Sequence, residues 1–193
     1  MAKIIVLPTM GKSGSLEVPE IRTDLLMLTK LAGMPLGPTP SAVDRALDGL
    51  IGRKMKDAEF TGEQGQHLLV DLNGGSHSAR PQRAILLVGL GSAQKFCGKV
   101  ACQVFRLVID QAVEQGITQV TIPFAPNRMT VSSLNLKGTA HILREVVDER
   151  LSGRKGARAS LKEIQVLCTP QARKHIQEGL DIPSRHKSVC CVD

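Results

Sequence analysis

The sequence predicts an α/β protein, a three-layer sandwich of helices around a central mixed sheet. Three observations favour this class: short aliphatic runs of strand length recur, stretches with apolar residues at helical spacing separate them, and glycine or proline marks most junctions. The chain has 193 residues, 42% of them hydrophobic, which is enough for one sizeable core. We therefore expect one domain over residues 1–180 and a flexible basic tail over residues 181–193.

The predicted strands are short and aliphatic. They cover residues 3–7, 25–31, 67–72, 84–88, 118–123 and 161–168. The run at 84–88 is uninterrupted and precedes Gly89 and Gly91, which predicts a central strand buried on both faces and a sharp turn after it. Gly11, Lys12 and Ser13 look like the end of a phosphate-binding P-loop. That motif needs a glycine where this chain has Val6, so we reject it.

The predicted helices are amphipathic. They cover residues 41–54, 93–115 and 131–151, and a last helix starts at Thr169 and Pro170 and ends at Gly179. Ser41 and Asp44 form a weak version of the capping box at the start of the first helix. A threonine followed by proline suits the start of the last one, because the hydroxyl caps and the proline needs no amide partner. The apolar stripe of residues 93–115 indicates packing against a sheet.

Composition and charge narrow the function. The net charge of +7 favours phosphate-bearing partners or anionic surfaces without establishing them. Four phenylalanines, no tyrosine and no tryptophan argue against modules that stack nucleic-acid bases on exposed rings. No apolar run approaches the roughly 20 residues that span a bilayer, and the N-terminal apolar run is too short for a signal peptide. We expect a cytoplasmic protein with reduced cysteines and no membrane partner.

The turn after residues 84–88 admits two interpretations. In the first, Gly89, Gly91, Ser92 and Lys95 form a candidate anion site, because free N–H groups and a helix dipole meet at such a turn. In the second, the glycines only let the chain change direction. The cysteines form no CxxC pair and the histidines are scattered, so we expect no metal site and no cofactor.

Two further candidates each have a plainer alternative. The candidate nucleic-acid contacts are Arg154, Lys155, Arg158 and Lys162. Such residues would give salt-dependent binding, and a solvated basic loop is the alternative. Cys97 lies near a predicted helix start, where a thiolate is favoured, with His67 or His141 as a candidate base. A buried structural thiol is the alternative there.

Short motifs in a fixed order resemble one family. They are F-T-G-E-Q-G at 60–65, I-L-L-V-G-L-G at 85–91, an early D-L-L-M-L strand at 24–28, and a last strand at 161–167 with a helix ending E-G-L at 178–180. Over residues 21–180 the chain resembles the N-terminal domain of the leucyl aminopeptidase (cytosol aminopeptidase) family. The resemblance implies a macro-domain-like fold.

The resemblance also implies what this chain does not do. In the family, the peptidase chemistry belongs to a separate C-terminal domain with a two-metal site and an NTDAEGRL motif, and nothing like that motif occurs here. Two-metal hydrolysis needs converging carboxylates, which the sequence does not supply, so we expect no peptidase activity from this chain.

Three functions remain as alternatives. The first is a non-catalytic module for assembly or regulation, pairing with itself or with a full-length aminopeptidase. The second is a macro-like domain that binds ADP-ribose or another nucleotide. Macro domains that hold a diphosphate have a glycine-rich loop after the strand that corresponds to 118–123, and residues 124–130 contain no glycine. The third is a basic DNA-binding module.

Overall fold

A computed structural model describes residues 2–8, 18–73, 81–124, 135–152 and 160–183. Its centre is a six-stranded sheet with the order β1-β6-β5-β2-β4-β3. The strands are β1 (Lys3–Leu7), β2 (Thr23–Lys30), β3 (His67–Asp71), β4 (Gln82–Gly89), β5 (Gln119–Pro123) and β6 (Glu163–Leu167). β3 runs antiparallel to β4 and every other pair is parallel, so the predicted mixed sheet is confirmed.

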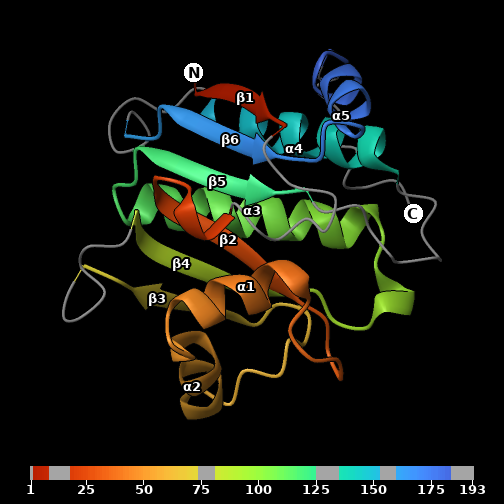
Figure 1. Ribbon diagram of the computed structural model, residues 1–193. Helices are drawn as coiled ribbons and strands as arrows, with labels where there is room; N and C mark the ends of the chain where they lie inside the picture. The colour runs from red at the N-terminus through yellow and green to blue at the C-terminus, as the bar shows by residue number, and fades with distance from the viewer. Residues whose placement is uncertain (1, 9–17, 74–80, 125–134, 153–159, 184–193) are drawn as a thin grey trace.

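Helices cover both faces of the sheet (Figure 1). The helices are α1 (Pro38–Ala46), α2 (Leu50–Asp57), α3 (Gly98–Glu114), α4 (Leu136–Leu151) and α5 (Arg173–Leu180), with short 3-10 turns η1 (Val18–Glu20) and η3 (Ala93–Lys95). α1, α2 and η1 pack on the β2–β4–β3 half of one face, while α3, α4 and α5 pack on the opposite face. The predicted three-layer sandwich is therefore confirmed.

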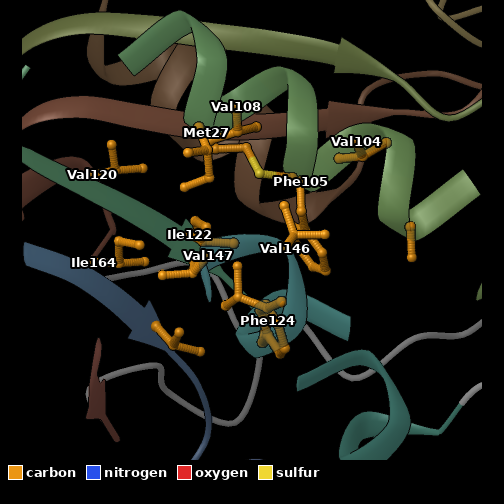
Figure 2. Close-up of a cluster of buried hydrophobic side chains, with 14 of the residues drawn as sticks. Met27, Val104, Phe105, Val108, Val120, Ile122, Phe124, Val146, Val147 and Ile164 are labelled. Carbon is orange, nitrogen blue, oxygen red and sulfur yellow. The ribbon is translucent and has the colours of Figure 1, made fainter. Parts of the chain in front are cut away.

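The larger core lies between the sheet and α3, α4 and α5. Side chains from β2, β5 and β6 meet those of α3 and α4 there, as Figure 2 shows for Met27, Val108, Ile122 and Val147. Aliphatic residues supply most of this core because the chain has few aromatic ones. β4 contributes to both cores, with Leu86 facing one and Leu87 the other, and both side chains are fully buried. The prediction that this strand is buried on both faces is confirmed, but it is not the central strand, because only β3 lies between it and the end of the sheet.

The prediction of one helix over residues 41–54 is wrong. The structure has α1 and α2 instead, separated at Asp48 (φ 53°) and Gly49 (φ 77°). Two successive residues with left-handed backbone cannot continue a right-handed helix. Leu47 and Ile51 are both buried across this break, so the apolar spacing that predicted one helix belongs to two short ones.

The other helix boundaries also differ. Residues 93–115 form η3 and then α3, because Phe96 and Cys97 between them have extended backbone. The predicted helix at 131–151 is observed from Leu136, with Asn135 as its cap at 2.8 Å from the Gly138 amide; residues 131–134 lie outside the described ranges. α5 starts at Arg173 rather than at Thr169 or Pro170.

Gly179 does not end α5 as predicted, because the helix continues to Leu180. Its role is close packing: a Cβ there would overlap the Lys137 carbonyl oxygen and lie 2.9 Å from the Ala140 Cβ on α4. The predicted domain boundary at residue 180 stays a prediction, as does the tail, since residues 184–193 lie outside the described part.

Candidate functional site

The turn predicted as an anion site follows β4 at the carboxyl edge of the sheet. The Gly89 amide donates to the Gln66 carbonyl, the Leu90 amide to Lys30 and the Gly91 amide to Gly62, each at 2.9 Å. These three N–H groups therefore already have protein partners. Ser92 and Lys95 lie at η3, where the Lys95 amide donates to the Ser92 carbonyl at 3.0 Å. An anion role for this group stays a prediction and depends on these last two residues.

The neighbouring turn at residues 60–66 is organised by Gln66. Its Oε1 accepts hydrogen bonds from the amides of Thr61, Gly62 and Glu63 at 3.0, 2.9 and 3.0 Å. Successive N–H groups that point inward form an anion-binding concavity in many proteins. In this structure the carboxamide oxygen of Gln66 occupies that concavity.

Lys30 joins this turn to the end of β2. The residue is only 9% exposed, and its Nζ donates to the carbonyls of Leu31, Met34 and Thr61 at 3.0, 2.8 and 2.9 Å. A buried ammonium requires such partners. This role was not predicted from the sequence; its signal is a lysine that ends a strand containing the apolar run at residues 25–28.

The sheet has a topological switch point between β2 and β5. After β2 the chain continues to β4 and β3 on one side, and after β5 it continues to β6 on the other. In open α/β sheets, ligands bind in the crevice outside the carboxyl ends of two such strands. A cavity of about 110 Å³ lies there, beside Thr29 at the end of β2 and Phe124 directly after β5.

The cavity is mainly apolar. It is lined by Met27, Thr29, Leu90, Phe96, Ala101, Val104, Phe105, Ile122, Pro123, Phe124, Leu136 and Thr139. Three of the four phenylalanines of the chain are in this lining, and Phe105 stacks on Phe124 with ring centroids 5.9 Å apart. The cavity volume is below the range of about 300–1,000 Å³ usual for drug-sized ligands. Its size and lining suit one apolar or flat group and not a diphosphate.

The other predicted residues do not join this cavity lining. Lys162 is exposed immediately before β6, while Arg154, Lys155 and Arg158 lie outside the described residues, so the nucleic-acid site stays a prediction. His67 is on the edge strand β3. His141 is on α4, with Nε2 3.3 Å from Glu145 Oε1.

The cysteines differ in state. Cys97 is an exposed free thiol that precedes α3, and Cys168 is a buried free thiol after β6. Burial raises the pKa of Cys168, and the nearby Arg173 charge opposes this shift. Cys102, on α3, is fully buried, and the expectation of reduced cysteines stays a prediction. Over the described ranges, no three His, Cys, Asp or Glu side chains are grouped as metal ligands, and no helix combines the length and apolarity of a membrane span.

The sheet order, the helices on both faces and the cavity at the switch point define a macro-domain-like α/β fold. The chain is similar to the macro domain of ganglioside induced differentiation associated protein 2, with a TM-score of 0.67 and 13% identity over 92% of this chain and 82% of that one. A Trypanosoma brucei macrodomain in complex with ADP-ribose matches with a TM-score of 0.64 and 16% identity, over 91% and 68%. At such identities the likeness concerns the fold.

The family follows from the sequence. The model of the cytosol aminopeptidase family, N-terminal domain, matches residues 28–152, which is more than half of the chain, so the chain belongs to this family. A probable cytosol aminopeptidase of Cupriavidus taiwanensis is 34% identical over 99 residues, which are 51% of this chain and 18% of that protein. A tomato leucine aminopeptidase mutant has a TM-score of 0.61 and 16% identity over 93% of this chain and 35% of its own. The chain thus spans a minor part of these relatives.

Proposed function

We propose that this chain is a non-catalytic binding domain that acts in the assembly or regulation of an aminopeptidase, through a second copy of itself or a full-length enzyme. The extent of the matches carries the proposal: the family model that matches is that of the N-terminal domain, and the aligned part is 18% of the relative's length. The relatives are named cytosol aminopeptidases, which supports a cytoplasmic location.

Two measurements test this proposal. The purified chain, supplied with zinc or manganese, is assayed on a leucyl-amide reporter; we expect no hydrolysis above the rate of a heat-denatured sample. Sedimentation velocity then measures its mass alone and with a full-length cytosol aminopeptidase; we expect self-association or co-sedimentation. Metal-dependent hydrolysis would overturn the first half, and a strict monomer that binds no peptidase would overturn the second.

A second candidate, nucleotide binding, has one specific observation in its favour. The cavity lies at the switch point, where α/β sheets hold ligands, and three phenylalanines line it. The Thr29 hydroxyl, which also lines the cavity, has no hydrogen bond to the described residues and can accept or donate one to a ligand. The trypanosomal macrodomain was solved with ADP-ribose. We infer that any nucleotide here would place its base in this cavity.

Calorimetric titration with adenosine and with ADP-ribose tests this candidate. If the cavity holds the base, both compounds bind with similar affinity, and Thr29→Val weakens both. Lys56→Met, an exposed substitution on α2, serves as the control and should change neither. Absence of heat with both compounds up to millimolar concentration would dispose of nucleotide binding.

A further inference from the structure

The outer edge of β3 is an open strand edge. Among the described residues, β3 pairs only with β4, on one side, and it forms one end of the sheet in Figure 1. Its two leucines, Leu68 and Leu69, lie on opposite faces and are only partly buried. An exposed edge with apolar side chains is a template for pairing with another strand.

The direction of the free backbone groups follows from the ladder with β4. The Gly89 amide donates to the Gln66 carbonyl and the Leu72 amide to the Arg83 carbonyl, so even-numbered residues direct their N–H and C=O groups to β4. In an antiparallel ladder the groups alternate, and His67, Leu69 and Asp71 direct theirs outward. These outward groups have no hydrogen-bond partner within the described part of the chain.

A second copy of β3 fits this edge in one register particularly well. If the two strands run antiparallel about a two-fold axis at Leu69, each Leu69 faces its copy, and each His67 faces the second copy's Asp71. Every facing pair among these residues has both N–H and C=O groups pointing across the interface, so each can exchange two hydrogen bonds. Both His67 and Asp71 are exposed, and an imidazole N–H can donate to a carboxylate.

The opposite edge of the sheet, formed by β1, is less suited to pairing with a second copy. On β1, the Lys3 amide bonds to the Lys162 carbonyl and the Leu7 carbonyl accepts from the Cys168 amide, so the outward residues of the strand are Ile4 and Val6. Pro8 follows the strand at once and has no N–H to donate. A two-fold pairing about Ile5 would place Lys3 against Leu7, with no charge complement.

We propose that β3 pairs with β3 of a second copy of this chain in the register centred on Leu69, joining the two sheets into one. The proposal rests on the proposed assembly function and names its surface and partner. A cross-strand hydrogen bond from the His67 imidazole to Asp71 of the second copy favours this register. A five-residue edge makes a small contact, typical of weak association.

The test is sedimentation velocity of the full chain over a concentration series, with hydrogen exchange at the β3 amides. Leu69→Pro removes one outward N–H without breaking the β4 ladder, since proline is tolerated at the open side of an edge strand. We expect the dimer dissociation constant to rise at least about tenfold, the scale of one lost anchoring contact of 1.4 kcal/mol. Lys3→Glu, on the β1 edge, is the matched control and should leave dimerisation unchanged.

A charge exchange tests the register itself. Asp71→Lys removes the carboxylate acceptor and should weaken the dimer, and His67→Glu combined with Asp71→Lys should restore it, because a carboxylate and an ammonium then face each other. Asp71 Oδ1 also accepts from the Asn73 amide at 2.9 Å, so Asp71→Ala reports the loss of that turn contact without adding repulsion. Circular dichroism checks that each variant is folded.

The outcomes separate this inference from the proposed function. A dimer that Leu69→Pro and the charge exchange leave unchanged overturns the β3 pairing, while the assembly function stands. A chain that is monomeric but binds full-length aminopeptidase also overturns the β3 pairing and leaves the assembly function standing. A monomer that binds no peptidase overturns both. The β3 pairing in this register is supported if the dimer is lost in Leu69→Pro and in Asp71→Lys, and if adding His67→Glu to Asp71→Lys recovers it.

Discussion

Gly89 at the end of β4 lies directly against the backbone of Glu63, so closely that a Cβ at Gly89 would overlap the Glu63 carbonyl oxygen. Gly89→Ala must therefore displace the 60–66 turn. Because backbone on both sides is fixed by hydrogen bonds, we expect a loss of about 3 kcal/mol in the free energy of unfolding, the upper range for overpacking. Urea denaturation measures it.

Gly98→Ala is the matched control. Gly98 begins α3, and a Cβ there would be in ordinary contact with the Ile142 side chain at 3.4 Å. Alanine is also the better helix former, so stability should be unchanged or slightly higher. Equal effects of the two substitutions would contradict the assignment of Gly89 as a packing glycine.

The buried ammonium of Lys30 holds the end of β2 to the turn at residues 60–66. Lys30→Met keeps the length of the side chain but leaves three carbonyls without their charged donor. We expect a loss of about 2 kcal/mol, within the range for hydrogen bonds to charged groups, and faster amide exchange at Gly89 and Gly91, which share this corner. Lys56→Met is the exposed control. Unchanged stability and exchange in Lys30→Met would show that water replaces the ammonium.

The oxygen of Gln66 fills the concavity formed by three amides. Gln66→Ala removes the acceptor and should destabilise the protein by about 1 kcal/mol, the scale of an ordinary hydrogen bond, because the amides of Thr61 and Glu63 are exposed and can turn to water. Gln66→Glu keeps an oxygen in the same place and should retain most of the stability. Thermal denaturation of both variants measures this; equal losses would mean that the side-chain amide, and not the oxygen, is what matters.

The layer order of the fold could be predicted from the sequence because strand-length aliphatic runs that alternate with amphipathic helices bury their apolar faces best in a sheet covered by helices. The runs that became β4 and β6 are apolar on the faces that α3 and α4 cover, and this pattern is local. The break at Asp48 and Gly49 was missed because the apolar spacing continues across it, although an Asp-Gly pair is a turn signal. A left-handed aspartate leaves no mark in a hydrophobic pattern.

The site was predictable only in part. Glycines after a strand indicate a turn, but whether their amides are free depends on segments far apart in sequence, such as Gln66 and Lys30. The cavity is formed by Thr29, Phe96 and Phe124 from separate segments, and each alone looks like an ordinary core or loop residue. Contacts between residues so far apart in the sequence cannot be recognised from local sequence patterns.

Asp24, near the amino end of β2, accepts hydrogen bonds from Thr118 and Gln119 at the amino end of β5. It makes the free energy of unfolding depend on pH in the acid range. Burial alone would raise the pKa of its carboxyl, but hydrogen bonds from the Thr118 hydroxyl and amide, the Arg83 charge and the Gln119 amide together lower the pKa. A lowered folded-state pKa stabilises the protein fully above the unfolded value of about 3.9. That contribution is lost as the pH falls through the lowered pKa.

Asp24→Asn should therefore be less stable than the wild type at neutral pH, with a difference that stays constant down to about pH 5 and shrinks below about pH 4. The main donor is the Thr118 hydroxyl, 2.5 Å from Asp24 Oδ2, so Thr118→Val should reduce the acid dependence. The Arg83 side chain is 59% exposed, and its Nη1 lies 3.4 Å from Asp24 Oδ1. Exposed ion pairs contribute little to stability, so Arg83→Met should keep the acid dependence. Urea titrations between pH 3 and 7 measure all three; a constant difference in Asp24→Asn over that whole interval would contradict the lowered pKa.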